Sequence, residues 1–182
     1  MRLEERTLFR ADQTAAAEKS RGGGLEIYIH NTWCTLTKTV RTFCSPDLEN
    51  LAGKCRPFKL SRELSSVIVT AGHIQPKATA KLALEQLYCF VSGQLSNSPD
   101  EAGIVAADFN HVNLKAALPR FHKFIKFFIT LPTRDNNTLD QVYCNIPAAN
   151  KAAAAPHFGS SGHISVDLIP AYKPLTCRTR PR

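Results

Sequence analysis

Hydrophobic and polar residues alternate over several short stretches of the chain, a pattern typical of strands that bury one face. The clearest case follows Gly22, Gly23 and Gly24, where Leu25, Ile27 and Ile29 would share the buried face of a strand over residues 25–30. A nearly continuous apolar run over residues 65–74 predicts a strand that is covered on both faces. Further strands are predicted over residues 35–42, 51–58, 138–146 and 164–169.

Residues 77–95 carry the strongest helical pattern, because Leu84, Leu87, Tyr88 and Val91 recur at helical spacing. A shorter helix is predicted from residue 111 to Pro119. Residues 1–20 are only weakly periodic and are expected to be loop or a poorly anchored terminus, and the alanine-rich residues 151–156 are expected to be a connection. The order of strands and helices predicts a mixed α/β domain.

Polar residues appear where the short apolar run Ile104–Ala107 ends. Asp108 and Asn110 are separated by one apolar residue, so on an extended chain both side chains would point to the same side. One interpretation is a strand end followed by an Asx turn. The other is a carboxylate and a carboxamide that together hold a hard cation or orient a phosphate. The spacing alone leaves both interpretations open.

Composition indicates one globular domain, since 182 residues with 43% hydrophobic residues are enough for a sizeable core. No apolar run is long enough to cross a bilayer, and the charged start has no signal-peptide pattern, so we expect an intracellular protein that does not engage membranes. The six cysteines form no C-x-x-C pair, which favours reduced thiols and no disulfide-linked partner.

The formal charge of +8 favours an anionic partner such as nucleic acid, although a basic protein without such a partner has the same charge. Basic residues gather over residues 115–126, and the last ten residues, 173–182, predict a basic disordered tail. The interleaved Phe121, Phe124, Phe127 and Phe128 are open to two interpretations, a platform for stacking bases or a buried strand.

Four motifs in order are more specific than any one alone: Val105–Asn110, Pro132–Arg134, Thr138–Tyr143 and Gly159–His163. Together they resemble the endonuclease/exonuclease/phosphatase superfamily, which has the DNase I-like fold. The likeness is greatest to the endonuclease domain of LINE-type, non-LTR retrotransposons, and it extends to about Pro174.

This resemblance implies an α/β fold that is part of a four-layer αββα sandwich with mixed sheets. Residues 21–172 would form a partial domain, with the first strands of the family upstream of residue 1. The implied reaction is magnesium-dependent hydrolysis of DNA phosphodiester bonds, and the implied location is intracellular and possibly nuclear.

The resemblance also assigns roles to individual residues. Asp108, Asn110, Asp140 and His163 match catalytic positions, and Asp108 would be the main magnesium ligand. Thr133 and His73 fall at positions that contact the phosphate, with His73 in place of a tyrosine.

Three departures from the family pattern bear on activity. Ala107 stands where the family has glycine, and Gly162 replaces the aspartate of the terminal S-D-H motif, which would leave His163 without an orienting carboxylate. The glutamate that is a principal metal ligand would fall before residue 1. We therefore expect a truncated, degenerate domain of retrotransposon origin whose hydrolysis is lost or very weak. The alternatives are a non-catalytic basic module that binds nucleic acid and a product without a selected role.

Overall fold

The computed structural model describes residues 6–12, 24–34, 37–95, 100–110, 112, 125–126, 132–133, 137–146, 150–157 and 162–170. Within them the elements follow one another as β1 (Arg6–Asp12), β2 (Gly24–His30), β3 (Thr37–Cys44), β4 (Leu48–Cys55), β5 (Ser66–Ile74), α1 (Ala80–Leu95), β6 (Glu101–Asp108), β7 (Ile125–Lys126), β8 (Asp140–Cys144), β9 (Asn150–Ala155) and β10 (Ser165–Pro170).

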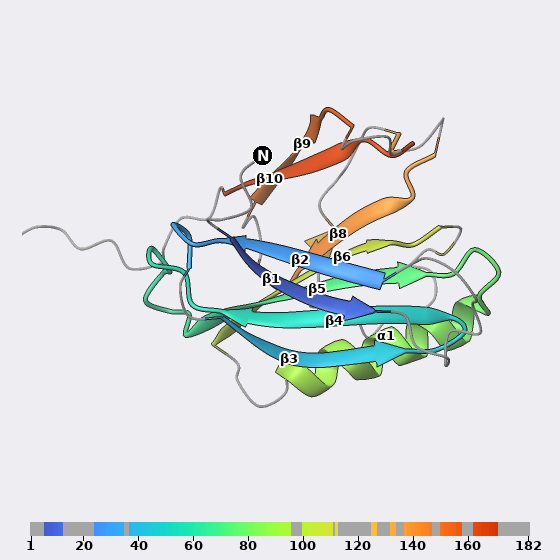
Figure 1. Ribbon diagram of the computed structural model, residues 1–182, viewed down its shortest axis with the longest axis horizontal. Coiled ribbons are helices and arrows are strands. Elements are labelled where there is room, and N and C mark those ends of the chain that lie inside the picture. The colour runs from blue at the N-terminus through green and yellow to red at the C-terminus, as the bar shows by residue number, and fades with distance from the viewer. Residues whose placement is uncertain are drawn as a thin grey trace, which may run out of the picture.

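A mixed six-stranded sheet with the order β3-β4-β5-β6-β8-β7 forms the centre of the described fold (Figure 1). Strands β5 and β6 are parallel and α1 connects them, whereas the other neighbouring pairs are antiparallel. The helix packs on one face of this sheet, where Leu84 and Leu87 join a buried cluster with Leu48, Ile68 and Val105. Each buried aliphatic side chain of this kind stabilises the fold by about 1.5–3 kcal/mol.

The opposite face of the sheet carries two separate pairs of strands, β1–β2 and β9–β10 (Figure 1). Phe9, Ile27 and Ile29 of the first pair pack with Leu51 and Cys55 of β4. Val166 of β10 packs against Val142 and Cys144 of β8. The described part therefore has a helical layer, a central sheet and a layer of paired strands, which confirms the predicted mixed α/β class and is consistent with a partial DNase I-like fold.

Two local predictions are wrong. Residues 6–12 are not loop but strand β1, which pairs with β2 at every position from Arg6 to Asp12. Residues 151–156 are not merely a connection, because β9 pairs with β10 along its whole length. In both cases the pairing partner decides the structure, since alanine and weakly periodic residues give little strand signal on their own.

The other predicted elements in the described part are confirmed with shifted boundaries. The helix begins at Ala80 rather than residue 77, and the strand predicted at 51–58 runs from Leu48 to Cys55. The predicted helix at 111–119 lies outside the described residues apart from Val112, as do the four phenylalanines Phe121, Phe124, Phe127 and Phe128 and the tail 173–182. No helix in the described ranges has the length and apolar character needed to cross a membrane.

Candidate functional site

Strand register brings four ionisable residues into one row across the central sheet. Glu49 of β4 lies opposite His73 of β5, His73 lies opposite Asp108 of β6, and Asp108 lies opposite Asp140 of β8. On each strand, the residue two positions away from the member of this row faces the paired strands rather than α1. These residues are Leu51, Ala71, Ala106 and Val142. Because side chains alternate along a strand, the four residues of the row point to that same face.

His163 lies against this row and contacts Asp140. The Nδ1 atom of His163 is 2.7 Å from Oδ2 of Asp140, and both side chains are partly buried. The expectation that Gly162 leaves His163 without an orienting carboxylate is therefore wrong, because Asp140 supplies one from a neighbouring strand. An acidic residue that binds one ring nitrogen of histidine fixes the orientation of the ring.

Asp108 completes a group of three possible ligands. One ligand atom from each of Asp108, Asp140 and His163 lies within 4.8 Å of the others. Two carboxylates supply the oxygen atoms that a hard cation such as Mg²⁺ prefers, while His163 already engages Asp140 through Nδ1. The donor set thus fits a divalent ion that is bound mainly by carboxylates and completes its coordination with water.

Asn110 forms a tight turn after β6 rather than extending the strand. Its backbone N–H donates to Oδ1 of Asp108 at 2.9 Å, which is the predicted Asx turn. Its side-chain amide donates to the carbonyl of Ile74 at 2.7 Å, and its φ of 48° is in the left-handed region that asparagine tolerates. The turn joins the end of β6 to the end of β5 and holds Asp108 where β6 ends.

Thr133 links the segments that carry Asp140 and His163. Its buried hydroxyl accepts hydrogen bonds from the N–H groups of Leu139 and Asp140 at 2.9 and 3.1 Å. Its carbonyl accepts a hydrogen bond from the N–H of Ile164 at 2.9 Å. The structure thus assigns Thr133 a positioning role, and its contact with a phosphate stays a prediction.

Glu49 is a site residue that sequence reasoning missed. Its side chain is 4% exposed, and its Oε1 accepts a hydrogen bond from Nε2 of Gln75 at 2.5 Å. The same oxygen lies 3.9 Å from Nδ1 of His73, so His73, like His163, lies beside a carboxylate. No sequence signal identifies Glu49, because its position depends on the register between β4 and β5.

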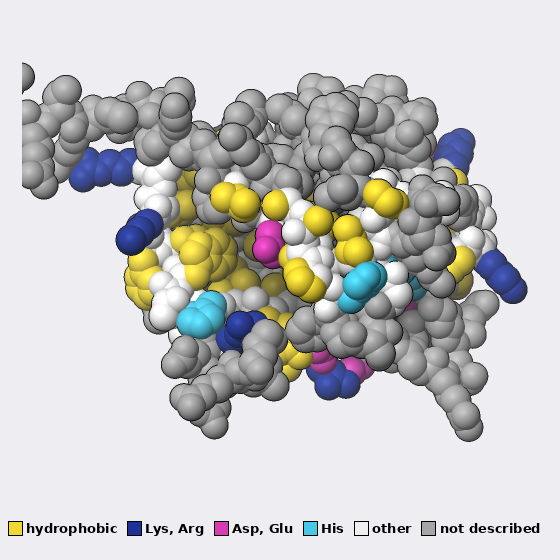
Figure 2. Space-filling view, turned by 90° about the horizontal axis from the view of Figure 1, so that it is seen from above, with side chains coloured by type: hydrophobic (Ala, Val, Ile, Leu, Met, Phe, Trp, Pro, Cys, Tyr) yellow, Lys and Arg dark blue, Asp and Glu magenta, His cyan; other side chains and the backbone are white. Residues whose placement is uncertain are grey.

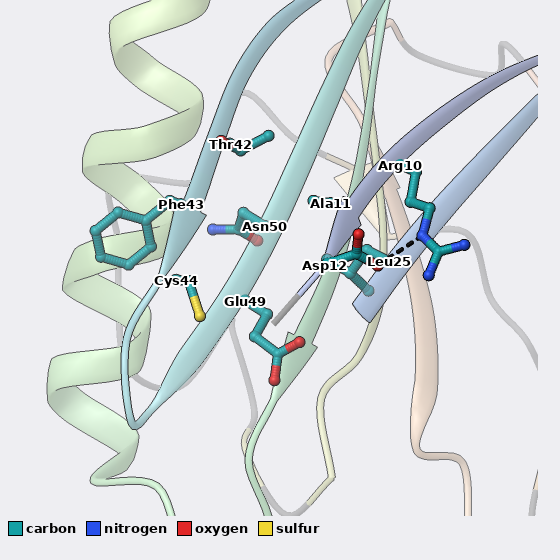
Figure 3. A pocket seen from close by; sticks show the side chains of 9 residues that line it. All are labelled: Arg10, Ala11, Asp12, Leu25, Thr42, Phe43, Cys44, Glu49 and Asn50. Carbon is teal, nitrogen blue, oxygen red and sulfur yellow. Dashed lines mark hydrogen bonds and ion pairs between the residues drawn. The ribbon is translucent and has the colours of Figure 1, made fainter. Parts of the chain in front are cut away.

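A cavity of about 340 Å³ lies next to Glu49, between the ends of β1 and β2 and the edge formed by β3 and β4. Figure 3 shows Glu49 and Asp12 near this space and Phe43 directed away from it toward α1. The Nε atom of Arg10 lies 2.6 Å from Oδ1 of Asp12, so the one guanidinium that lines the cavity is paired. The cavity therefore lies at the Glu49 end of the row.

Several solved structures share this arrangement of strands and helix. The endonuclease domain of TRAS1, a telomere-specific non-LTR retrotransposon, aligns with a TM-score of 0.63 and 11% identity over 93% of this chain and 82% of its own. D. rerio TDP2 in complex with a single-strand DNA product aligns with a TM-score of 0.56 and 11% identity over 88% and 72%. The chain has the DNase I-like fold.

An endonuclease/exonuclease/phosphatase family protein from Bacteroides thetaiotaomicron has the same DNase I-like fold, with a TM-score of 0.54 and 10% identity over 88% of this chain and 74% of its own. The chain spans 60% of a humanized D. rerio TDP2, with a TM-score of 0.51 and 13% identity over 77% of this chain. No protein-family model and no curated protein matches the sequence. Identities of 10–13% show the fold alone.

Proposed function

We propose that the chain is a nuclease-type domain that binds a divalent cation and DNA at Asp108, Asp140 and His163 and hydrolyses phosphodiester bonds very slowly, if at all. The observation that carries the proposal is the 2.7 Å contact of Asp140 with His163, with Asp108 in the same group of ligand atoms. A DNase I-like fold in which a carboxylate orients a histidine beside a second carboxylate supports phosphodiester chemistry.

Each residue of the site has a separate role in this proposal. Asp140 holds the ring of His163 through Nδ1, so proton transfer at a phosphodiester involves Nε2. Asp108, fixed by the Asx turn with the backbone N–H of Asn110, holds the cation, and the side-chain amide of Asn110 keeps the turn in place through Ile74. A bound Mg²⁺ would stabilise the negative charge that develops on the phosphate oxygens.

One departure supports a very low rate. His73 stands where the resemblance places a phosphate-contacting tyrosine. Catalytic groups that act as a unit lose most of their joint effect when one of them is removed. We expect the remaining groups to bind the cation and DNA but to hydrolyse DNA very slowly.

The test is nicking of supercoiled plasmid by the purified chain with millimolar Mg²⁺, compared with Asp108→Ala. The expected result is nicking at or near background for both proteins, with cation binding lost in Asp108→Ala. Asp167→Ala is the matched control, since Asp167 is an exposed aspartate on β10 away from the row of Glu49, His73, Asp108 and Asp140. Reproducible nicking that Asp108→Ala abolishes and Asp167→Ala preserves would overturn the claim of lost turnover.

A second candidate is a non-catalytic module that binds nucleic acid through charge, which the net charge of +8 favours. In that case DNA affinity falls steeply with salt and is the same for the unmodified chain and Asp108→Ala, with or without Mg²⁺. DNA binding that is absent at low salt or insensitive to salt would exclude this candidate. An intracellular location, with the nucleus as one candidate compartment, is part of either proposal.

A further inference from the structure

Two large apolar side chains are exposed at the end of the sheet opposite the candidate site. Trp33 follows β2 and is 41% exposed, and Phe58 follows β4 and is 62% exposed. Strand β4 begins beside Glu49 and ends at Cys55, and at about 3.3 Å per residue the two ends are about 20 Å apart. These aromatic residues are therefore remote from Asp108 and His163.

The backbone under both aromatic residues is firmly held. The N–H of Phe58 donates to the carbonyl of Trp33 at 3.0 Å, so the two residues sit on adjacent segments. The N–H of Arg56 donates to Sγ of Cys34 at 3.1 Å, and both Cys34 and Cys55 are fully buried in the core cluster under β1 and β2. The aromatic side chains are thus presented by an anchored surface.

Three basic residues that follow β4 lie within four positions of Phe58 along the chain. Arg56, Lys59 and Arg62 are all exposed in the segment between β4 and β5. Among nearby acids, Glu63 follows Arg62 and is partly buried, and Glu101 is buried and bound by Lys54 near the end of β4. We call Trp33, Phe58, Arg56, Lys59 and Arg62 the aromatic–basic patch. Figure 2 shows Lys and Arg side chains beside hydrophobic ones at the left end of the molecule, where the segment after β4 lies in Figure 1.

We propose that the aromatic–basic patch binds single-stranded nucleic acid. Exposed aromatic rings stack on unpaired bases, and flanking Lys and Arg side chains neutralise the phosphates between them. Bases inside a duplex are already stacked on one another, so the patch selects single strands. This surface is distinct from the cation site and does not depend on the proposed function of Asp108.

Trp33 makes the proposal directly measurable, because it is the single tryptophan of the chain. A base stacked on the indole quenches its fluorescence, so titration with a dT oligonucleotide reports contact at the patch itself. We expect saturable quenching, weaker binding of a duplex of the same length, and affinity that falls as salt rises.

Variants separate stacking from general attraction. Phe58→Ala is expected to weaken dT binding about tenfold, and Arg56→Gln to weaken it and to reduce the salt slope by about one. Leu82→Ala, which removes another exposed apolar side chain from α1, is the matched control and keeps the affinity. The titrations are run without Mg²⁺ and are read at Trp33, so a failure of the proposed cation site leaves this result unchanged.

The proposal is overturned if Trp33 fluorescence does not respond to dT, or if folded Phe58→Ala binds as tightly as Leu82→Ala. The competing occupant is a second copy of the chain. Concentration-dependent association in sedimentation that Phe58→Ala abolishes, without DNA-dependent quenching, would assign the patch to self-association instead.

Discussion

The ring of His163 is held by the carboxylate of Asp140, with Nδ1 and Oδ2 2.7 Å apart. The two residues come from segments separated by 23 positions, and Thr133 connects both through its hydroxyl and its carbonyl. The contact compensates for Gly162, which has no side chain to orient the imidazole. The pair is the part of the candidate site that the structure defines most completely.

The His163–Asp140 contact should be detectable as a coupling energy. We expect a double-mutant cycle of His163→Ala and Asp140→Ala to give about 0.5–1 kcal/mol of coupling in the free energy of unfolding, because both side chains are partly exposed. Urea unfolding of the four proteins measures it. Strictly additive effects of the two substitutions would mean that the contact does not form in solution.

Thr133 should matter more for stability than its size suggests. Thr133→Val keeps the shape of the side chain but removes the acceptor for two backbone N–H groups, which should cost about 1–3 kcal/mol in the free energy of unfolding. The matched control is Thr42→Val, at an exposed position of β3, which should change the free energy of unfolding by no more than about 0.5 kcal/mol. Equal effects of the two substitutions in urea titrations would contradict the positioning role.

Gly162 offers a gain-of-function test. A Cβ atom at this position meets nothing within 4 Å, so an aspartate is sterically allowed next to His163. We expect Gly162→Asp to raise Mg²⁺ affinity about tenfold, which corresponds to ~1.4 kcal/mol from the added carboxylate. Calorimetric titration measures the affinity, with Gly162→Asn as the uncharged control. If the two variants bind Mg²⁺ alike, position 162 does not face the cation.

Alkaline pH should destabilise the fold. Burial, with a smaller contribution from Cys34, raises the pKa of Cys55 from 9.0 to about 12, and burial raises the pKa of Tyr143 from 10.0 to about 12. The unfolded chain has lost these protons while the folded chain retains them between pH 9 and 12 for Cys55 and between pH 10 and 12 for Tyr143. The free energy of unfolding therefore falls as pH rises, by up to about 1.4 kcal/mol per pH unit for each group.

Urea midpoints at pH 8 and pH 10.5 under reducing conditions measure this fall. Cys55→Ala should flatten the pH dependence, whereas Cys89→Ala should leave it unchanged because Cys89 is exposed. A pH dependence that is identical in all three proteins would show that burial of Cys55 does not control its ionisation.

Much of the fold follows from patterns that are local in sequence. The apolar spacing of Leu84, Leu87 and Val91 is sufficient to predict α1, and the apolar run around Ile68 is sufficient to predict β5. Strands β1 and β9 are not predictable in this way, because their weak local preference is overcome by pairing with β2 and β10.

The site was predictable where residues follow a motif and not where they depend on register. Asp108, Asp140 and His163 come from separate motifs, and the structure brings them together. Glu49 joins the row only because β4 pairs with β5 at one particular offset, which no local pattern encodes. The orientation of His163 was not predictable for the same reason, since the carboxylate that fixes its ring belongs to Asp140 on β8.

Thermal unfolding with and without millimolar Mg²⁺ tests the central claim most directly, since a cation that binds only the folded state raises its melting temperature. We expect a cooperative transition that Mg²⁺ shifts upward in the unmodified chain and leaves in place in Asp108→Asn. No shift in the unmodified chain, or an equal shift in both proteins, would contradict a divalent-cation site at Asp108, Asp140 and His163.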